Sequence, residues 1–202
     1  MIVLREIEYL LVPWKNGGGV TREIHKFPPD AAQFEWRLSL ATIERPGPFS
    51  AFDGYERTLV LMRGAGVALD FGPHGRETLD TAGQVARFDG SWPTTCTLLD
   101  GPSTDLNLIV SKSTTQARAR VTTLAAAETV QTSGWDDVLF CCVAGAARIE
   151  NASGALTKLT GSDVARCGPD DGLVTVRPQG TEPVRMFIAA LRRRDAPGAT
   201  AP

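Results

Sequence analysis

The sequence predicts an all-β protein made of two small β-barrel or β-sandwich units. Turn-forming residues recur throughout the 202-residue chain, which contains 20 glycines and 13 prolines. The apolar segments between these turns are short, roughly five to eight residues, which is the length of a typical strand. This pattern is typical of an all-β sandwich or barrel. Residues 123–129 form the one short alanine-rich segment that suggests a helix, and we expect it to be a connector.

Three short patterns recur at a spacing of about 80 residues, which is too long for a solenoid repeat and suits a duplicated barrel. The recurring pairs are 61–65 with 142–146, 83–88 with 161–167, and the strands around Asn107 and Met186. We therefore predict a first barrel at 1–112 and a second at 113–194, packed together as one compact body. Residues 195–202 are predicted to be a disordered tail.

The clearest predicted hairpin joins Thr58–Met62 to Val67–Phe71 through Arg63-Gly64-Ala65-Gly66. A glycine-containing connection of three to five residues between two apolar runs is a usual hairpin signal. The same pattern at 142–146 predicts an equivalent connection in the second unit.

Composition excludes several classes of function. A net charge of -2 and a pI near 5.7 give no basic surface for nucleic acid. No apolar run approaches the roughly 20 residues of a membrane span, and the first residues lack a secretion signal. We expect a cytoplasmic protein with neither nucleic acid nor membrane as partner. The four cysteines have no Cys-x-x-Cys spacing, so buried reduced thiols are expected.

The densest group of polar residues surrounds a run of three glycines. The candidate ligand-binding residues there are Trp14, Lys15, Asn16, Gly17, Gly18, Gly19 and Arg22. Glycines let the backbone take positive φ and let a partner approach its amide groups closely. A ligand loop is one interpretation; a tight turn leading into a strand is the other.

Strand alternation adds further candidates. Arg37 and Ser39 share one face of their strand, and Asp105 and Asn107 share one face of theirs. Arg57 heads a strand that continues with apolar residues on the same face. Small barrels hold ligand cavities, so we predict that these side chains line one. The alternative is that they lie on a solvent-exposed face.

Cations outnumber acids among the candidates. Lys15, Arg22, Arg37 and Arg57 stand against Glu23 and Asp105. A buried guanidinium needs a carboxylate or a bound anion beside it. If the protein's own acids pair with every arginine, the cluster is a structural salt-bridge network. If one or two arginines stay unpaired, a ligand carboxylate is the natural partner, because it accepts two parallel hydrogen bonds from a guanidinium.

The sequence predicts no metal or other cofactor. His25 and His74 are its two histidines, and nothing in the sequence places them together. The acidic pairs Asp136-Asp137 and Asp170-Asp171 lie among turn residues, and we expect them to be solvated. The apolar segment 138–143 would supply either internal packing or the surface of a homodimer.

Several sequence blocks resemble the HutD/Ves family. They are 13–24, 36–41, 47–55, 57–61 and 101–107, in this order. The resemblance implies a cupin-type (bicupin) architecture of two barrels and an association with histidine utilisation in bacteria. That degradation pathway has carboxylate intermediates, urocanate and formylated or formimino glutamates, which would suit the predicted site.

Taken together, the sequence and the resemblance predict a metal-free sensor or modulator that binds a small anionic metabolite. Lys15, Arg37 and Arg57 would hold its carboxylate, Asn16, Ser39, Asp105 and Asn107 would orient it, and the glycine amides would add donors. Trp14 and Trp36 would wall the pocket or fill the core. One alternative is an isomerase or hydrolase that transfers protons through Lys15 with Glu23 or Asp105. The other is a structural or partner-binding module whose cavity is packed shut.

Overall fold

The computed structural model describes residues 1–14 and 16–194. The predicted tail, 195–202, and Lys15 lie outside the described residues. The elements are β-strands apart from three short 3-10 helices, η1 (Glu6–Glu8), η2 (Gly72–His74) and η3 (Pro169–Asp171). Within the described chain, none of these helices has the length and apolar character needed to cross a membrane. The predicted all-β class is confirmed.

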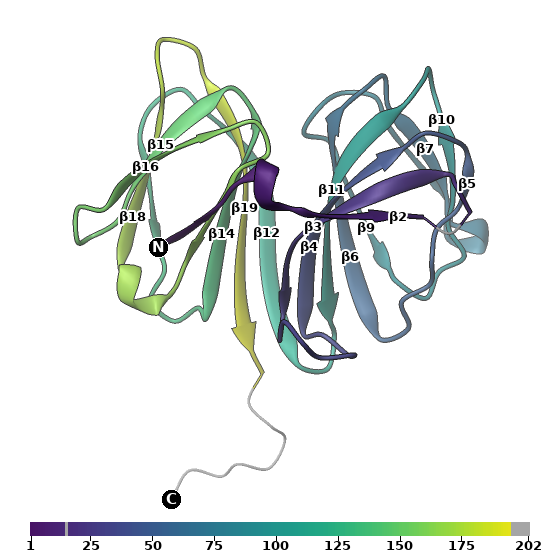
Figure 1. Cartoon of the computed structure of the whole chain (residues 1–202), viewed down its shortest axis with the longest axis horizontal. Helices are drawn as coiled ribbons and strands as arrows, with labels where there is room; N and C mark the ends of the chain where they lie inside the picture. Colours follow the sequence, from purple (N-terminus) through teal and green to yellow (C-terminus); the bar gives the residue numbers. More distant parts are fainter. Residues whose placement is uncertain (15, 195–202) are drawn as a thin grey trace, which may run out of the picture.

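The strands form two halves, each made of two sheets that face each other (Figure 1). In the first half a six-stranded sheet has the order β2-β3-β4-β11-β6-β9, and a four-stranded sheet has the order β5-β10-β7-β8. Their bounds are β2 Leu10–Pro13, β3 Gly19–Phe27, β4 Trp36–Ile43, β5 Gly47–Pro48, β6 Tyr55–Arg63, β7 Val67–Asp70, β8 Arg76–Leu79, β9 Val85–Asp89, β10 Thr95–Leu98 and β11 Ser103–Ser111.

The second half repeats this arrangement. A five-stranded sheet has the order β1-β17-β14-β19-β12, and a four-stranded sheet has the order β13-β18-β15-β16. Their bounds are β1 Ile2–Leu4, β12 Thr115–Leu124, β13 Glu128–Gln131, β14 Asp137–Ala144, β15 Ala146–Glu150, β16 Leu156–Thr160, β17 Val164–Cys167, β18 Leu173–Pro178 and β19 Val184–Arg193. Strands β12, β19, β14 and β17 thus correspond in order to β4, β11, β6 and β9, which supports the duplication that the sequence suggests.

Each half adds different strands to this common unit. Strands β2 and β3 widen the large sheet of the first half beside β4, whereas β1 joins the second half beside β17. The first residues of the chain therefore belong to the sheet of the second half. The predicted first unit, 1–112, differs from the observed sheets at this end.

The described chain contains three apolar cores, one between the halves and one inside each half. The first lies between the large sheets and contains Leu38 and Leu108 from one half and Leu139 and Phe187 from the other. The second fills the inside of the second half, and the third fills one part of the inside of the first. Two large sheets that pack face to face through such a core form a single body, in the manner of a β-sandwich.

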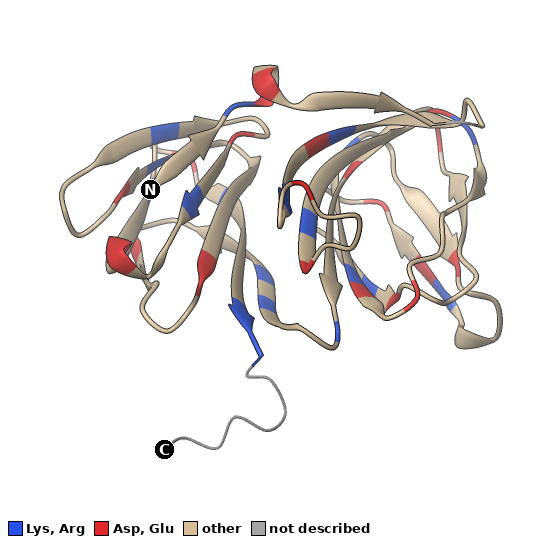
Figure 2. Cartoon of the chain, turned by 60° about the horizontal axis from the view of Figure 1, so that its bottom comes forward, with Lys and Arg blue, Asp and Glu red and all other residues tan. Residues whose placement is uncertain are grey.

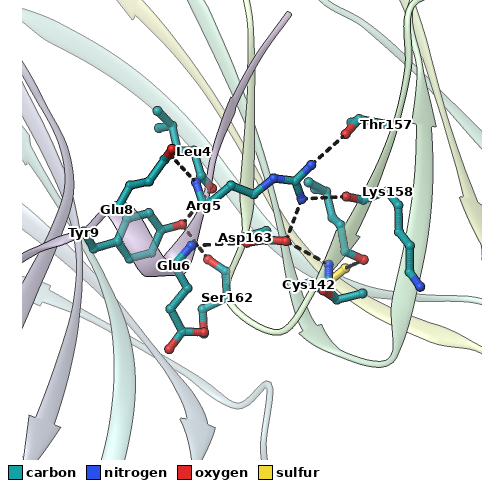
Figure 3. Close-up of polar contacts among 12 residues, drawn as sticks. Leu4, Arg5, Glu6, Glu8, Tyr9, Cys142, Thr157, Lys158, Ser162 and Asp163 are labelled. Atoms are coloured by element: carbon teal, nitrogen blue, oxygen red, sulfur yellow. Dashed lines mark hydrogen bonds and ion pairs between the residues drawn. The ribbon is translucent and has the colours of Figure 1, made fainter.

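The N-terminal segment crosses from the second half to the first (Figure 1). Figure 3 shows its polar contacts with the loop before β17. Arg5 Nη1 donates to Asp163 Oδ2 at 2.8 Å, and Tyr9 Oη donates to the carbonyl oxygen of Ser162 at 2.7 Å. Burial, together with nearby acids, raises the pKa of Tyr9, so its hydroxyl stays a donor. These contacts anchor the chain just before β2.

Two local predictions are wrong. Residues 123–129 are not a helix: β12 runs to Leu124 and β13 begins at Glu128. Pairing of β12 with β19 along its whole length outweighs the helix propensity of the alanines. Strands β6 and β7 do not form a hairpin either, because β6 pairs with β9 and β11 while β7 pairs with β8 and β10. The glycine turn between them passes from one sheet to the other.

The acidic pairs also differ from expectation, since one member of each is buried. Asp137 begins β14 and accepts from Arg166 Nε at 2.5 Å. Asp171 accepts from the N-terminal amine at 2.7 Å and from Asn151. All four cysteines are buried and free, and Cys141 and Cys142 point into different cores, as their alternation along a strand requires.

Candidate functional site

A cavity of about 570 Å³ lies in the first half, at the end that the third core leaves unfilled. This volume is within the range of small-molecule pockets. Its described lining is Val12, Pro13, Trp14, Asn16, Thr21, Glu23, Arg37, Ser39, Ala41, Pro48, Phe49, Ser50, Phe52, Arg57, Asp105 and Asn107. The cavity is therefore not packed shut.

Strand alternation places the polar side chains on the cavity wall. On β4, Trp36, Leu38 and Leu40 belong to the core between the halves, so Arg37 and Ser39 face the cavity. On β11, Leu106 and Leu108 belong to that same core. Asp105 and Asn107 therefore point to the opposite face of β11, toward the cavity, and Asn107 pairs with Ser39 on β4. The structure thus brings these four predicted residues to one cavity.

The glycine run builds the turn that positions Trp14 and Asn16. Gly17 has a φ of 65°, which favours glycine. A Cβ at Gly19 would lie 2.3 Å from the Thr42 carbonyl oxygen and 3.2 Å from the Trp14 ring. Asn16 Oδ1 accepts from the Gly18 amide at 3.0 Å, and Trp14 Nε1 donates to Thr21 Oγ1 at 2.8 Å. The tight-turn interpretation therefore accounts for these glycines.

Two guanidinium groups face the cavity without a carboxylate beside them. Arg57 is only 5% exposed and lies over the rings of Phe49, Phe52 and Phe88 at 5.0, 5.6 and 4.9 Å. Burial lowers its pKa to about 10, still far above neutrality, so it remains a cation. Arg37 is half-buried, lies over the Phe52 ring at 5.1 Å, and has its pKa lowered mainly by burial.

Among the described residues, no carboxylate comes within 4.0 Å of either guanidinium. The nitrogen Nε of Arg37 and that of Arg57 are buried without a hydrogen-bond partner. Arg57 has one long contact, from Nη1 to the Ser50 carbonyl oxygen at 3.5 Å. The face of an aromatic ring attracts a cation, but it does not accept the several hydrogen bonds that a guanidinium donates.

The cavity also contains buried acceptors. Both carboxyl oxygens of Asp105 and Oδ1 of Asn107 are buried without a partner in the described chain. Burial raises the pKa of Asp105 to about 7, against the opposing effect of Arg57. Unsatisfied groups of this kind each cost about 1–3 kcal/mol. The free energy of folding alone would not favour this arrangement, so these residues are candidates for a binding site.

Some predicted site residues lie elsewhere. Gly17, Gly18 and Gly19 do not line the cavity, and the Gly17 and Gly18 amides donate within the loop. Arg22 points to the other face of β3 and contacts Thr42 Oγ1 at 3.5 Å. Trp36 is buried in the core between the halves, so it does not wall this pocket. Lys15 lies outside the described residues.

The expected excess of cations is therefore absent from the described lining, where Arg37 and Arg57 face Glu23 and Asp105. What distinguishes the cavity is that these four charges are not paired. Sequence reasoning considered Glu23 as a partner of the arginines and as a proton-transfer group, but it counted neither Glu23 nor Thr21 among the ligand-binding residues. Their shared face on β3 could have placed both there. The lining residues that were not among the predicted ligand-binding residues are Val12, Pro13, Thr21, Glu23, Ala41, Pro48, Phe49, Ser50 and Phe52.

A second, smaller cavity of about 200 Å³ lies between the halves, near Trp36. Four of its six charged lining residues form ion pairs: Arg166 with Asp137 at 2.5 Å, and Arg193 with Glu35 at 3.0 Å. His25 Nε2 lies 3.1 Å from Arg166 Nη1, and its pKa is lowered by burial and by this arginine. These contacts are those of a structural network between the halves.

The register identifies the second-half counterparts of the cavity residues. Asp105 pairs with Leu61 and Ala41, as Met186 pairs with Cys142 and Thr122. By the same pairing, the counterparts of Asn107, Arg57, Ser39 and Arg37 are Ile188, Val138, Arg120 and Arg118. Met186, Ile188 and Val138 belong to the apolar core of the second half. Arg118 and Arg120 are exposed.

Charged residues of both signs are interspersed along the two halves (Figure 2). In the described part of the chain, no three His, Cys, Asp or Glu side chains gather in a metal-binding arrangement. The unpaired groups of the first-half cavity are therefore the best candidate for a functional site.

The fold defines a two-unit protein of the cupin type. An oxalate decarboxylase from Lactobacillus farciminis, solved as a formate complex, superimposes with a TM-score of 0.69 over 97% of this chain and 87% of its own, at 8% identity. At this identity the similarity concerns the fold alone. The HutD family profile matches residues 7–184, and the chain belongs to that family.

Two solved structures are similar over nearly the whole chain. A conserved protein of unknown function from Pseudomonas aeruginosa PAO1 has a TM-score of 0.85 and 29% identity, covering 95% of this chain and 98% of its own. HutD from Pseudomonas fluorescens SBW25, solved in a formate condition, has a TM-score of 0.80 and 31% identity, covering 96% and 99%.

Curated relatives match over a shorter region. An uncharacterised 21.2 kDa protein from the hutC 3' region of Pseudomonas putida is 39% identical over 57% of this chain and 61% of its own length. Protein Ves of Citrobacter koseri is 39% identical over 54% and 56%. The matched region thus spans less than two thirds of these relatives.

Proposed function

We propose that the first-half cavity binds a small carboxylate metabolite and that the protein acts as a sensor or modulator of histidine utilisation. The observation that carries this proposal is that Arg37 and Arg57 face an open cavity without a carboxylate within ion-pairing distance in the described chain. A ligand carboxylate would accept hydrogen bonds from guanidinium groups that the protein leaves unpaired.

The electrostatics support an anionic ligand. Asp105 has a pKa raised to about 7 by burial, so near neutral pH it is ionised only in part. The positive charge of Arg57 is then only partly balanced by the nearest acid. The flat walls provided by Trp14, Phe49 and Phe52 suit a planar or extended carboxylate, of which urocanate and formylglutamate are the two classes considered.

The proposal invokes no metal, because the described lining offers no histidine or cysteine ligands and its two acids are Glu23 and Asp105. A cytoplasmic location and a homodimer remain predictions from the sequence. The absence of nucleic acid and membrane partners is a prediction of the same kind.

Binding is tested by thermal unfolding with urocanate, N-formyl-L-glutamate, formate and acetate. A carboxylate at 100 times its Kd should stabilise the protein by about 2.7 kcal/mol. Arg37→Ala should weaken binding by roughly 10- to 100-fold, since a hydrogen bond to a charged group contributes about 1.5–3 kcal/mol. The matched control is Arg118→Ala, the exposed second-half counterpart, which lies over Trp135 at 5.4 Å. Equal binding by both variants would overturn the assignment of the site.

An enzyme is a second candidate because Asp105 is buried, unpaired and has a pKa near neutrality. Such a group can both accept and release a proton at working pH. Incubation with urocanate or N-formyl-L-glutamate, followed by NMR of the mixture, tests this function. Turnover that is lost in Asp105→Asn while binding persists would favour the enzyme; an unchanged spectrum with wild-type protein excludes it for these two compounds.

A further inference from the structure

The floor of the cavity carries three acceptor oxygens that receive no hydrogen bond from the described chain. They are Oδ1 and Oδ2 of Asp105 and Oδ1 of Asn107. Both residues are almost fully buried, at 2% and 6% exposure, and they lie on the same face of β11. Buried polar atoms in native proteins nearly always have a partner, so these oxygens accept from water when the cavity is empty and from a ligand when it is filled.

The neighbouring strands cannot supply those donors. Asp105 lies between Ala41 on β4 and Leu61 on β6, whose side chains are apolar. Asn107 lies between Leu59 and Ser39, and the Ser39 hydroxyl makes no hydrogen bond to it. Arg57 influences the Asp105 carboxyl electrostatically but is not hydrogen-bonded to it. The acceptors thus receive no hydrogen bond from the neighbouring strands, and they face the cavity.

A ligand carboxylate alone would not donate hydrogen bonds to these acceptor oxygens of Asp105 and Asn107. A carboxylate carries only acceptors when ionised, and it would be repelled by the oxygens of Asp105. A hydroxyl can donate one hydrogen bond, but its own lone pairs would then face the remaining acceptors. The N–H of an amide, amidine or azole donates without placing such lone pairs on the same atom.

We propose that the bound carboxylate also carries an N–H group, and that Asp105 and Asn107 are the residues that select for it. This inference rests on the proposed function, because it assumes that Arg37 and Arg57 hold the carboxylate end. The ligand would span the cavity, with its anionic end at the guanidinium groups and its N–H end at β11. Asp105 can accept in either protonation state, since a neutral carboxyl group retains its carbonyl oxygen.

The second half provides an internal reference for this assignment. The counterparts of Asp105 and Asn107 are Met186 and Ile188, which are 0% and 4% exposed within an apolar core. The same strand position in the same fold is therefore filled with hydrocarbon where no ligand is required. The polar pair of the first half is not a consequence of the architecture.

The test uses two matched pairs of probes in isothermal titrations at neutral pH. Urocanate is compared with 3-(1,3-oxazol-5-yl)acrylate, which has a ring oxygen in place of the N–H and keeps the second ring nitrogen. N-formyl-L-glutamate is compared with its N-methyl derivative. In at least one pair, the member with the N–H should bind at least about tenfold tighter, because a site built for a donor rejects the analogue that lacks it. Asp105→Asn should reduce this preference, whereas Asp100→Asn, at an exposed turn, should not.

The possible outcomes separate this inference from the proposed function. If no carboxylate binds, formate and acetate included, the proposed function fails and this inference fails with it. If carboxylates bind but the members of both pairs have equal affinity, only this inference is overturned. The comparison of the probe pairs uses wild-type protein, so it does not depend on the folding of a variant. Asn107→Leu provides a second variant and should also reduce the preference.

Discussion

The two halves share one strand arrangement but use the same interior positions differently. In the second half, Val138, Met186 and Ile188 complete an apolar core. In the first half, Arg57, Asp105 and Asn107 occupy these positions and face a cavity. The fold therefore does not require polar residues at these positions. Their presence in the first half points to a requirement other than folding.

The added strands explain why the cavity is enclosed in one half only. Strand β3 pairs with the outer edge of β4, and β2 pairs with β3, so Arg37 is covered on that side. Strand β12, the counterpart of β4, is itself the edge of its sheet, and its Arg118 and Arg120 are exposed. Two additional strands thus convert an exposed arginine position into a pocket wall.

The largest expected effect comes from placing the polar residue of one half into the other. Met186→Asp should destabilise the protein by about 3–5 kcal/mol, because it leaves an unpaired charge in an apolar core. Asp105→Met should cost less than Met186→Asp, because it removes a buried carboxyl group that has no hydrogen-bond partner in the described chain. Urea unfolding of both variants measures the difference, with Met186→Leu as a control that should cost less than about 1.5 kcal/mol. Comparable losses from both exchanges would contradict the equivalence of the two positions.

A second prediction concerns the pH dependence of stability. The pKa of Asp105 is raised from 3.8 in the unfolded chain to about 7 by burial. Between these values the folded protein holds a proton that the unfolded chain has lost, so stability falls as pH rises. The loss should be on the order of 4 kcal/mol across this range, at about 1.36 kcal/mol per pKa unit.

Asp105→Asn should remove this contribution, so the variant should gain stability relative to wild type as pH rises from 3.8 to about 7. Urea unfolding of the two proteins at several pH values within this range provides the measurement. A stability difference that does not change with pH would show that Asp105 titrates normally.

The glycine loop, which only the first half possesses, offers a smaller effect. Gly19→Ala should cost about 1–3 kcal/mol, because the added Cβ meets the Thr42 carbonyl oxygen and forces a backbone shift. Gly17→Ala has open space around its Cβ, and only its left-handed φ opposes the change, at about 1–2 kcal/mol. Thermal unfolding and ligand titration should show that Gly19→Ala also weakens binding, since Trp14 is displaced. If Gly17→Ala weakened binding more than Gly19→Ala, the displacement of Trp14 would not explain how the loop affects binding.

The smallest expected effect is at the N-terminal segment that connects the halves. Tyr9→Phe removes the hydrogen bonds to the Leu4 and Ser162 carbonyl oxygens and should cost about 1 kcal/mol. Amide hydrogen exchange should then be faster in β2, the strand next to the cavity. Unchanged exchange in β2 would show that these contacts do not hold it in place.

Much of the site follows from strand alternation in the sequence. A period of two residues places Arg37 with Ser39, and Asp105 with Asn107, and the structure brings both pairs to one cavity. The same alternation places Arg22 on the opposite face from Glu23, so it already argues against Arg22 as a cavity residue. The excess of cations expected in the cavity depends in part on the charge of Arg22, which lies on the other face.

Other features depend on contacts between distant segments and could not be read locally. The turn at 63–66 resembles a hairpin turn, but which sheet receives β7 is decided by its pairing with β8 and β10. The alanines at 125–127 favour a helix until the long pairing of β12 with β19 is known. Burial of Asp137 likewise depends on Arg166, which is 29 residues away in sequence.

The central claim is that one half binds a small carboxylate and the other does not, and a single spectrum can test it. Trp14 lines the cavity and donates from Nε1 to Thr21, whereas Trp135 packs against the core of the second half. Titration with urocanate or N-formyl-L-glutamate can be followed through the indole N–H signals in a proton–nitrogen correlation spectrum. The account predicts a saturable shift of the Trp14 signal while the Trp135 signal stays in place. No saturable change at Trp14, or an equal change at both, would contradict it.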